Sequence, residues 1–299
     1  MLRTLALIDA PSNLGLAPPA PGKEPGVRRM AGCLRALGLR EQLGAFDAGE
    51  VVPPPYGAER DPNTRIRNAL AIADYSFTLA RAVDAQLAAD RFPLIVGGDC
   101  SILLGCLLAL RHRGRHGLVF LDGHHDLQTP DVSRTGGAAG MDLALAVGIG
   151  PALLSALGAV PLVNASDVSM LAVRDDPKWY TGDDVVRARQ AMHVVYLDGL
   201  RKTGMGPAGE TVARRIMESG VNGAWVHLDV DVLDDAVMPA VDSRQPDGLS
   251  YEELDLLLRP VLDTGRVVGM NVTIYDPDRD PDGRAGRALV DGLVGLLGR

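Results

Sequence analysis

Carboxylates and imidazoles follow a short apolar segment near the middle of the 299-residue chain. Residues 118–121 read Leu-Val-Phe-Leu, which is typical of a fully buried strand, and Asp122, His124 and Asp126 come in the next five positions. If the chain stays extended, the two-residue period of a strand puts these three side chains on one face. Carboxylates at the mouth of a buried strand lose hydration and repel each other unless a cation lies between them. Residues 117–133 contain no Lys or Arg, so the pattern predicts a bound divalent metal ion.

Two further segments carry side chains of the same kind. Residues 225–231 read Trp-Val-His-Leu-Asp-Val-Asp, so Asp229 and Asp231 have the same two-residue spacing. After a third apolar run, the sequence Gly-Gly-Asp leads to Cys100. Solvated carboxylates or helix caps would explain one such segment more easily than several. If the two aspartate-bearing strands lie side by side, their ends form a metal cluster.

Taken in order, the motifs Gly-Gly-Asp-x-Ser, Asp-x-His-x-Asp and Asp-x-Asp resemble those of the arginase, agmatinase and formiminoglutamase family, the ureohydrolases, over nearly the whole chain. This resemblance implies a single three-layer α/β/α domain over residues 1–299, with a mainly parallel, doubly wound sheet. It also implies two Mn2+ ions bridged by a hydroxide that attacks a guanidinium or amidine carbon. The family further suggests a homo-oligomer, either a trimer or a hexamer.

The resemblance also assigns the metal ligands residue by residue. One ion would take Cys100, Asp122, Asp126 and Asp229, and the other would take His124, Asp122, Asp229 and Asp231. Asp122 and Asp229 would then bridge the two ions. Asp126 is in addition the candidate proton acceptor. His125 points the other way by strand parity, so it is expected to be packed or exposed.

Cys100 departs from the family pattern, which has histidine at this position. Three roles are open: a metal ligand, a buried cysteine packed as a small hydrophobe, and a covalent nucleophile with a neighbouring histidine as base. A helix N-terminus lowers the pKa of a thiol, which favours ligation by the thiolate. Because thiolate is softer than imidazole, Cys100 would shift the preference from Mn2+ toward Zn2+, Ni2+ or Fe2+.

Two more departures concern proton transfer. Ala139 stands where arginases and agmatinases carry the histidine of His-Gly-x-Pro, which helps to transfer protons, so that step is absent or supplied elsewhere. His227 shares a face with Asp229 and Asp231, where the family usually has a small residue. His227 is therefore a candidate catalytic residue, as a proton relay or as a support for the metal ligands.

The substrate residues depart as well. Ile274 stands in place of the glutamate that grips the guanidinium in guanidine-hydrolysing relatives, and an apolar side chain cannot do so. Asp242, Ser243 and Arg244 occupy the place of the substrate loop. Asp242 and Arg244 form either a surface salt bridge or, in the second alternative, a site where Arg244 holds a substrate carboxylate.

These residues predict a metal-dependent hydrolase of a non-peptide C–N bond in a linear amidine, guanidino or related compound. Because Ala139 and Ile274 replace a proton shuttle and a guanidinium anchor, L-arginine and agmatine are expected to be poor substrates. The competing hypothesis is a catalytically inactive or weakly active relative that binds metal or a ligand.

Composition narrows the class of partner. The net charge of −8 and the pI near 5.2 argue against nucleic acid and against anionic membranes, since both bind basic surfaces, and leave a small-molecule substrate. The three cysteines, Cys33, Cys100 and Cys106, form no spaced framework, which favours a reducing cytoplasm. No apolar run has the length of a membrane span.

Strands alternate with helices along the chain, and the candidate ligands fall at the carboxyl ends of strands, where open α/β sheets bind ligands. Asp198, after a strand, is expected in a turn. Ser250 and Glu253 form a capping box. Strands are expected at residues 5–8, 92–96, 118–121, 168–173, 194–197 and 267–274 and before Asp229, and helices at 27–39, 64–89, from 101, 143–157 with a break at 148–151, 184–192, 210–219 and 251–262.

Overall fold

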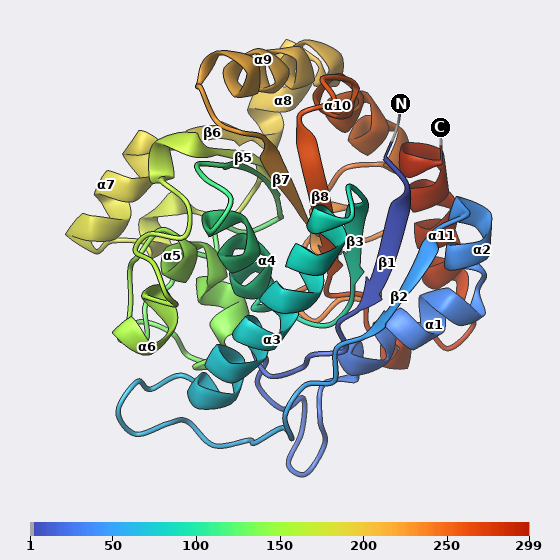
Figure 1. The fold of residues 1–299 in the computed structure, drawn as a ribbon. Coiled ribbons are helices and arrows are strands. Elements are labelled where there is room, and N and C mark those ends of the chain that lie inside the picture. The colour runs from blue at the N-terminus through green and yellow to red at the C-terminus, as the bar shows by residue number, and fades with distance from the viewer. Residues whose placement is uncertain (1–2, 299) are drawn as a thin grey trace.

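One sheet of eight strands runs through the centre of the computed structural model, which describes residues 3–298 (Figure 1). The strands are β1 (Leu5–Asp9), β2 (Phe46–Glu50), β3 (Phe92–Val96), β4 (Gly117–Leu121), β5 (Val168–Val173), β6 (His193–Tyr196), β7 (Ala224–Asp229) and β8 (Val267–Thr273). They pair in parallel throughout, in the order β2-β1-β3-β8-β7-β4-β5-β6. All their carboxyl ends therefore lie at one edge of the sheet.

Helices cover both faces of the sheet, which confirms the predicted three-layer arrangement (Figure 1). α3 to α7 pack on one face, and α1, α2 and α8 to α11 pack on the other. Their bounds are α1 (Met30–Ala36), α2 (Leu39–Leu43), α3 (Ala69–Ala88), α4 (Ile102–Arg111), α5 (Asp142–Ala146), α6 (Ala152–Ser155), α7 (Asp183–Ala191), α8 (Leu197–Thr203), α9 (Met205–Glu218), α10 (Tyr251–Asp263) and α11 (Arg284–Leu297).

Alternate residues of each central strand serve the two cores. In β4, Val119 and Leu121 pack with α8 to α11, whereas Leu118 and Phe120 pack with α3 to α5. Both faces of β4 are buried, as an all-parallel sheet with helices on each side requires. This is why the strand reads as a continuous apolar run rather than as an alternating one.

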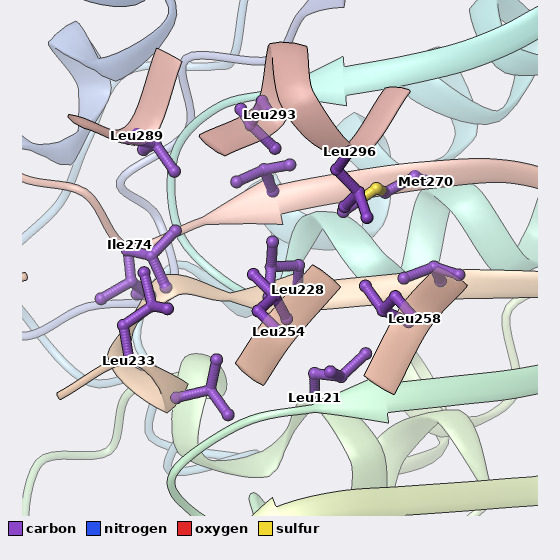
Figure 2. Close-up of a cluster of buried hydrophobic side chains, with 14 of the residues drawn as sticks. Leu121, Leu228, Leu233, Leu254, Leu258, Met270, Ile274, Leu289, Leu293 and Leu296 are labelled. Carbon is purple, nitrogen blue, oxygen red and sulfur yellow. The ribbon is translucent and has the colours of Figure 1, made fainter. Parts of the chain in front are cut away.

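The core under α10 and α11 reaches the carboxyl edge of the sheet. Figure 2 shows Met270 of β8 beside Leu296 and Leu228 of β7 beside Leu254, with Ile274 and Leu233 at the end of the cluster where the strands stop. Burying one such side chain contributes about 1.5–3 kcal/mol to folding. The apolar core thus continues into the region where the candidate functional residues lie.

Most predicted elements occur within a few residues of their expected bounds, including the capping box of Ser250 and Glu253. The expectation that Asp198 lies in a turn is wrong. It lies in the first turn of α8, where it accepts a hydrogen bond from Lys202 Nζ at 3.0 Å. β2 and α11 were not expected, and β2 lacks an apolar pattern because it is an edge strand with mostly exposed side chains. Within residues 3–298, no helix combines the length and the apolar character that a membrane span needs.

Candidate metal centre

The segments predicted to carry metal ligands meet at the carboxyl edge of the sheet. β4 and β7 are neighbours, with Leu121 opposite Leu228, so Asp122 and Asp229 stand next to each other at the ends of the paired register. Cys100 lies between β3 and α4, two strands away from β7 across β8. Segments that are far apart in the sequence therefore contribute to one site.

A glycine pair makes the sharp turn that brings Cys100 into the site. Gly97 and Gly98 have φ values of 153° and 64°, which side chains rarely allow. A Cβ on Gly97 would lie 2.3 Å from the carbonyl oxygen of Ala10, and one on Gly98 would lie 2.2 Å from that of Ser12. Only glycine therefore fits at positions 97 and 98 without a shift of the neighbouring backbone.

His124 is enclosed by two carboxylates. Its Nδ1 lies 2.9 Å from Asp231 Oδ2 and 3.5 Å from Asp122 Oδ1, and the three side chains offer ligand atoms within 4.8 Å of one another. Although burial disfavours the imidazolium, Asp231 and Asp122 raise the pKa of His124 to about 12. Burial and the charge of Asp231 raise the pKa of Asp122 to about 7. Protons on His124 and Asp122 thereby offset part of the negative charge of this cluster.

Cys100 and Asp229 form a second group on the other side. The Cys100 thiol donates to Asp229 Oδ2 at 2.8 Å and lies 3.3 Å from Thr273 Oγ1. Burial, together with the charges of the nearby carboxylates, raises the pKa of Cys100. The pKa of Cys100 is thus raised rather than lowered, opposite to the expectation from its position at a helix N-terminus, because burial and the nearby negative charges dominate. A cation beside the sulfur would favour the thiolate.

His227 lies behind this group, away from solvent. One of its ring nitrogens is within 4.8 Å of ligand atoms of Cys100 and Asp229. Its ring stacks on Phe120 with centroids 4.7 Å apart, and burial lowers the pKa of His227 to about 3. It is therefore a neutral imidazole packed between the sheet and the candidate ligands.

Buried carboxylate oxygens without partners indicate that a cation fits this site. Asp122 Oδ2 and both oxygens of Asp142 have no hydrogen-bond partner among the described residues. Burial and the neighbouring carboxylates raise the pKa of Asp126, Asp142 and Asp229. An uncompensated buried charge is unfavourable by several kcal/mol, so the donor set suits divalent cations.

His125 points away from this cluster, as strand parity predicts. It is buried, and its Nδ1 is bonded to Asp175 Oδ1, while its Nε2 lies 3.2 Å from the Tyr196 hydroxyl. Tyr180 also donates to Asp175. Of the two expectations for His125, the packed position is confirmed.

A cavity of about 670 Å³ opens onto the candidate ligands. Ala139, Asp242, Ser243 and Ile274 line it, as do Cys100, His124, Asp126, Asp229 and Asp231. The size is in the range of small-molecule sites. The cavity therefore joins the predicted metal ligands to most of the predicted substrate residues.

The whole chain matches known proteins. The family model described as "Arginase family" matches residues 4–296. The chain belongs to the arginase family. It is 28% identical over 306 residues to the arginase of Bacillus caldovelox, an alignment that covers 99% of each chain. The native structure of the Bacillus caldovelox arginase matches with a TM-score of 0.88 at 25% identity, covering 100% of this chain and 99% of that one.

The structure of the proclavaminate amidino hydrolase from Streptomyces clavuligerus has a similar fold. It matches with a TM-score of 0.73 at 22% identity, covering 99% of this chain and 91% of that one. The predicted family and fold are confirmed by these comparisons. The protein is an arginase-family hydrolase that acts on carbon–nitrogen bonds other than peptide bonds.

Arg244 of this arginase-family chain does not lie where the sequence suggested. Its Nε and one terminal nitrogen bond the two carboxylate oxygens of Asp235 at 2.5 and 2.6 Å. The expected pairing with Asp242 is therefore wrong, because Asp235 takes the guanidinium. Arg244 is not among the residues that line the cavity, so the structure gives no support to a contact with a substrate carboxylate.

Sequence reasoning missed three residues of the arginase-family site. Arg134 lines the cavity and brings a cation to its wall. Gln245 Nε2 lies 2.6 Å from His124 Nε2, beside Ser243 Oγ at 3.1 Å. Asp142 is fully buried beside the ligands. These residues come from loops or a helix start, where no strand period marks a side chain as facing the site.

Proposed function

We propose that this arginase-family hydrolase holds two divalent metal ions and cleaves a C–N bond of a linear amidine or guanidino compound that also carries an acidic group. The main support is the cavity, whose wall combines the candidate ligands with Asp242 and Arg134. An amidine or guanidine is cationic and complements Asp242, the acidic lining residue that is not a proposed metal ligand. An acidic group on the same molecule complements Arg134.

The metal ligands we propose are those assigned by the family resemblance. One ion would be held by Cys100, Asp122, Asp126 and Asp229, and the other by His124, Asp122, Asp229 and Asp231. When bound, two divalent ions supply Lewis-acid stabilisation and a water activated near neutral pH. Family resemblance favours Mn2+, and Zn2+, Ni2+ or Fe2+ becomes the better choice if the Cys100 thiolate is a ligand.

The remaining tasks fall to the protein's own side chains. Asp126 lines the cavity next to the ligands and is the proposed proton acceptor. Ser243 and Gln245 contact His124 Nε2 and restrict the orientation of its ring. Asp242 is the proposed partner for the cationic end of the substrate.

Ile274 limits how a guanidinium can bind. It lies in the apolar core that reaches the cavity, and its φ of 75° is strained for a β-branched residue (Figure 2). A guanidinium without its carboxylate partner loses about 1.5–3 kcal/mol, roughly one to two powers of ten in binding. The alanine at position 139 removes a proton shuttle, which is worth a further factor of about 10² or more. L-arginine and agmatine should therefore be poor substrates.

Arginase activity itself is the second candidate, because the most similar relatives bear that name. Release of urea, ammonia and amines should be assayed across a panel of amidines and guanidines with and without carboxylates, with Mn2+, Zn2+, Ni2+ and Fe2+ supplied separately. A kcat/KM for L-arginine near about 10⁴ M⁻¹s⁻¹, the lower end of ordinary enzymes, would favour the second candidate.

Two arginine variants test whether Arg134 binds an acidic group of the substrate. Arg134→Gln should raise KM for carboxylate-bearing substrates about tenfold or more, because a charge-assisted contact is lost. Arg244→Gln is the matched control and should leave KM unchanged, since Arg244 pairs with Asp235 outside the cavity. Equal effects of the two substitutions would contradict the role of Arg134.

Family resemblance supports three further proposals. Residues 1–299 would act as a single domain, and the chain would assemble as a trimer or hexamer in the cytoplasm. Sedimentation equilibrium measures the assembly, and a monomer at micromolar concentration would refute it.

A further inference from the structure

A second buried polar group lies beneath the candidate metal centre. Asp142, His227, Asn271 and Trp225 are all fully buried, and they do not line the cavity. Asp142 opens α5, whereas the other three belong to the neighbouring strands β7 and β8. Four buried polar side chains in one place need an explanation in terms of hydrogen bonding or charge.

The hydrogen bonds of this group determine which nitrogen of His227 carries a proton. The indole N–H of Trp225 can only donate, and it donates to Asn271 Oδ1 at 2.7 Å. The amide NH2 of Asn271 must therefore face His227 Nδ1, which lies 2.7 Å away. Because the NH2 group can only donate, Nδ1 is the acceptor, and the proton of the neutral ring is on Nε2.

This tautomer excludes His227 as a metal ligand through Nε2, although the ring lies near Cys100 and Asp229. Nε2–H is instead a donor, and it has no hydrogen-bond partner among the described residues. The nearest carboxylate oxygen that faces it is Asp142 Oδ2, at 3.9 Å. A small movement of either side chain would close this gap into a hydrogen bond.

Both carboxylate oxygens of Asp142 are buried without a hydrogen-bond partner among the described residues, and the carboxyl groups of Asp122 and Asp126 lie near it. Burial raises the pKa of Cys100 and of Asp126, and the charge of Asp142 is among those that raise them further. The backbone holds it there, since Ala144 N donates to Asp126 O at 3.2 Å and Gln128 N donates to Gly140 O at 3.1 Å. A carboxyl group buried in this way without a donor must either keep its proton or lie beside a cation.

From these contacts we propose that Asp142 is a further carboxylate ligand of the ion on the Cys100 side, and that His227 is the positioning residue that donates to it. The inference rests on the proposed metal centre. Metal ligands are commonly oriented by such a hydrogen-bonded neighbour, here supported in turn by Asn271 and Trp225. An added carboxylate makes the donor set harder, which favours Mn2+ even where Cys100 stays a thiol.

Equilibrium dialysis of the metal-free protein against Mn2+ tests this, with the number of bound ions and their Kd values as readouts. Asp142→Asn should weaken one of two bound ions by more than about tenfold and leave the other within about threefold. Asp9→Asn is the matched control, because Asp9 is also buried, also has an unpartnered oxygen, and pairs with Arg35 rather than the cluster. It should bind Mn2+ as the wild type does.

Two variants of His227 separate positioning from packing. His227→Phe keeps the ring on Phe120 but removes the donor, and should weaken the same ion by about 10- to 100-fold. His227→Gln keeps an acceptor for Asn271 and an N–H donor for Asp142, so it should restore most of the affinity. Equal binding by the two variants would overturn the positioning role.

The outcomes distinguish this inference from the proposed function. If the wild type binds none of Mn2+, Zn2+, Ni2+ and Fe2+, the proposed metal centre fails together with the inference. If it binds two ions and Asp142→Asn binds them equally well, only the inference is overturned. If Asp142→Asn is unfolded by circular dichroism, the comparison of His227→Phe with His227→Gln decides the matter.

Discussion

Removing the metal ions should leave a protein whose stability falls as the pH rises from about 5 to about 8. Burial and the charge of Asp231 raise the pKa of Asp122 from 3.8 to about 7. The folded metal-free chain therefore keeps a proton that the unfolded chain releases. Stability from this group is fully present below pH 3.8 and is lost as the pH rises through about 7.

The size of the effect follows from this shift. At about 1.4 kcal/mol per unit, the two pH units between 5 and 7 amount to about 3 kcal/mol. His124 acts in the same direction above pH 6.5, because Asp231 and Asp122 outweigh burial and raise its pKa to about 12. At about 2–4 °C per kcal/mol, the melting temperature should fall by roughly 6–12 °C.

Differential scanning calorimetry of EDTA-treated protein at pH 5, 6, 7 and 8 measures this change. Saturating Mn2+ should flatten the profile at pH 7 and above, since cations then balance the carboxylates in place of protons. Asp122→Asn, an uncharged isostere, should reduce the slope of the metal-free profile. A metal-free melting temperature that is constant or rises over this range would refute the reasoning.

Three further results are expected. Asp122→Ala and Asp229→Ala should each abolish binding of both ions by equilibrium dialysis, because both residues would bridge, and full retention by either variant would remove its bridging role. Cys100→His should shift selectivity toward Mn2+ and Cys100→Ala should empty one site preferentially, whereas identical metal content and preference in all three proteins would reassign Cys100 to packing. Ile274→Glu, alone and with Ala139→His, should raise guanidine hydrolysis at least about tenfold by restoring a charged contact and a proton shuttle, and no increase in either variant would show that the cavity differs by more than these two positions.

The departures from the family pattern are connected in space. Cys100 and His227 come from separate segments, yet both lie on one side of the candidate metal centre, near Asp142. Ala139 and Ile274 face the cavity on its substrate side. Replacements on both sides of the centre are the reason to test substrates beyond L-arginine.

The sequence by itself determined every strand except the edge strand β2, together with the fold class and the edge of the sheet that carries the site. Buried strands such as residues 118–121 need apolar side chains on both faces, and that pattern is visible locally. Strand parity correctly separated His125 from His124, because successive side chains point to opposite faces. The resemblance to the family motifs then assigned metal ligands to particular residues of these segments.

The tertiary structure alone decided how loops and helix starts approach the centre. Asp142 has no periodic relation to the other candidate ligands, and Arg134 and Arg244 are equally plausible cations until the loops are placed. The tautomer of His227 depends on Asn271 and Trp225, which the pairing of β7 with β8 brings together. Local periodicity follows from backbone geometry, whereas these contacts depend on which distant segments the folded sheet places side by side.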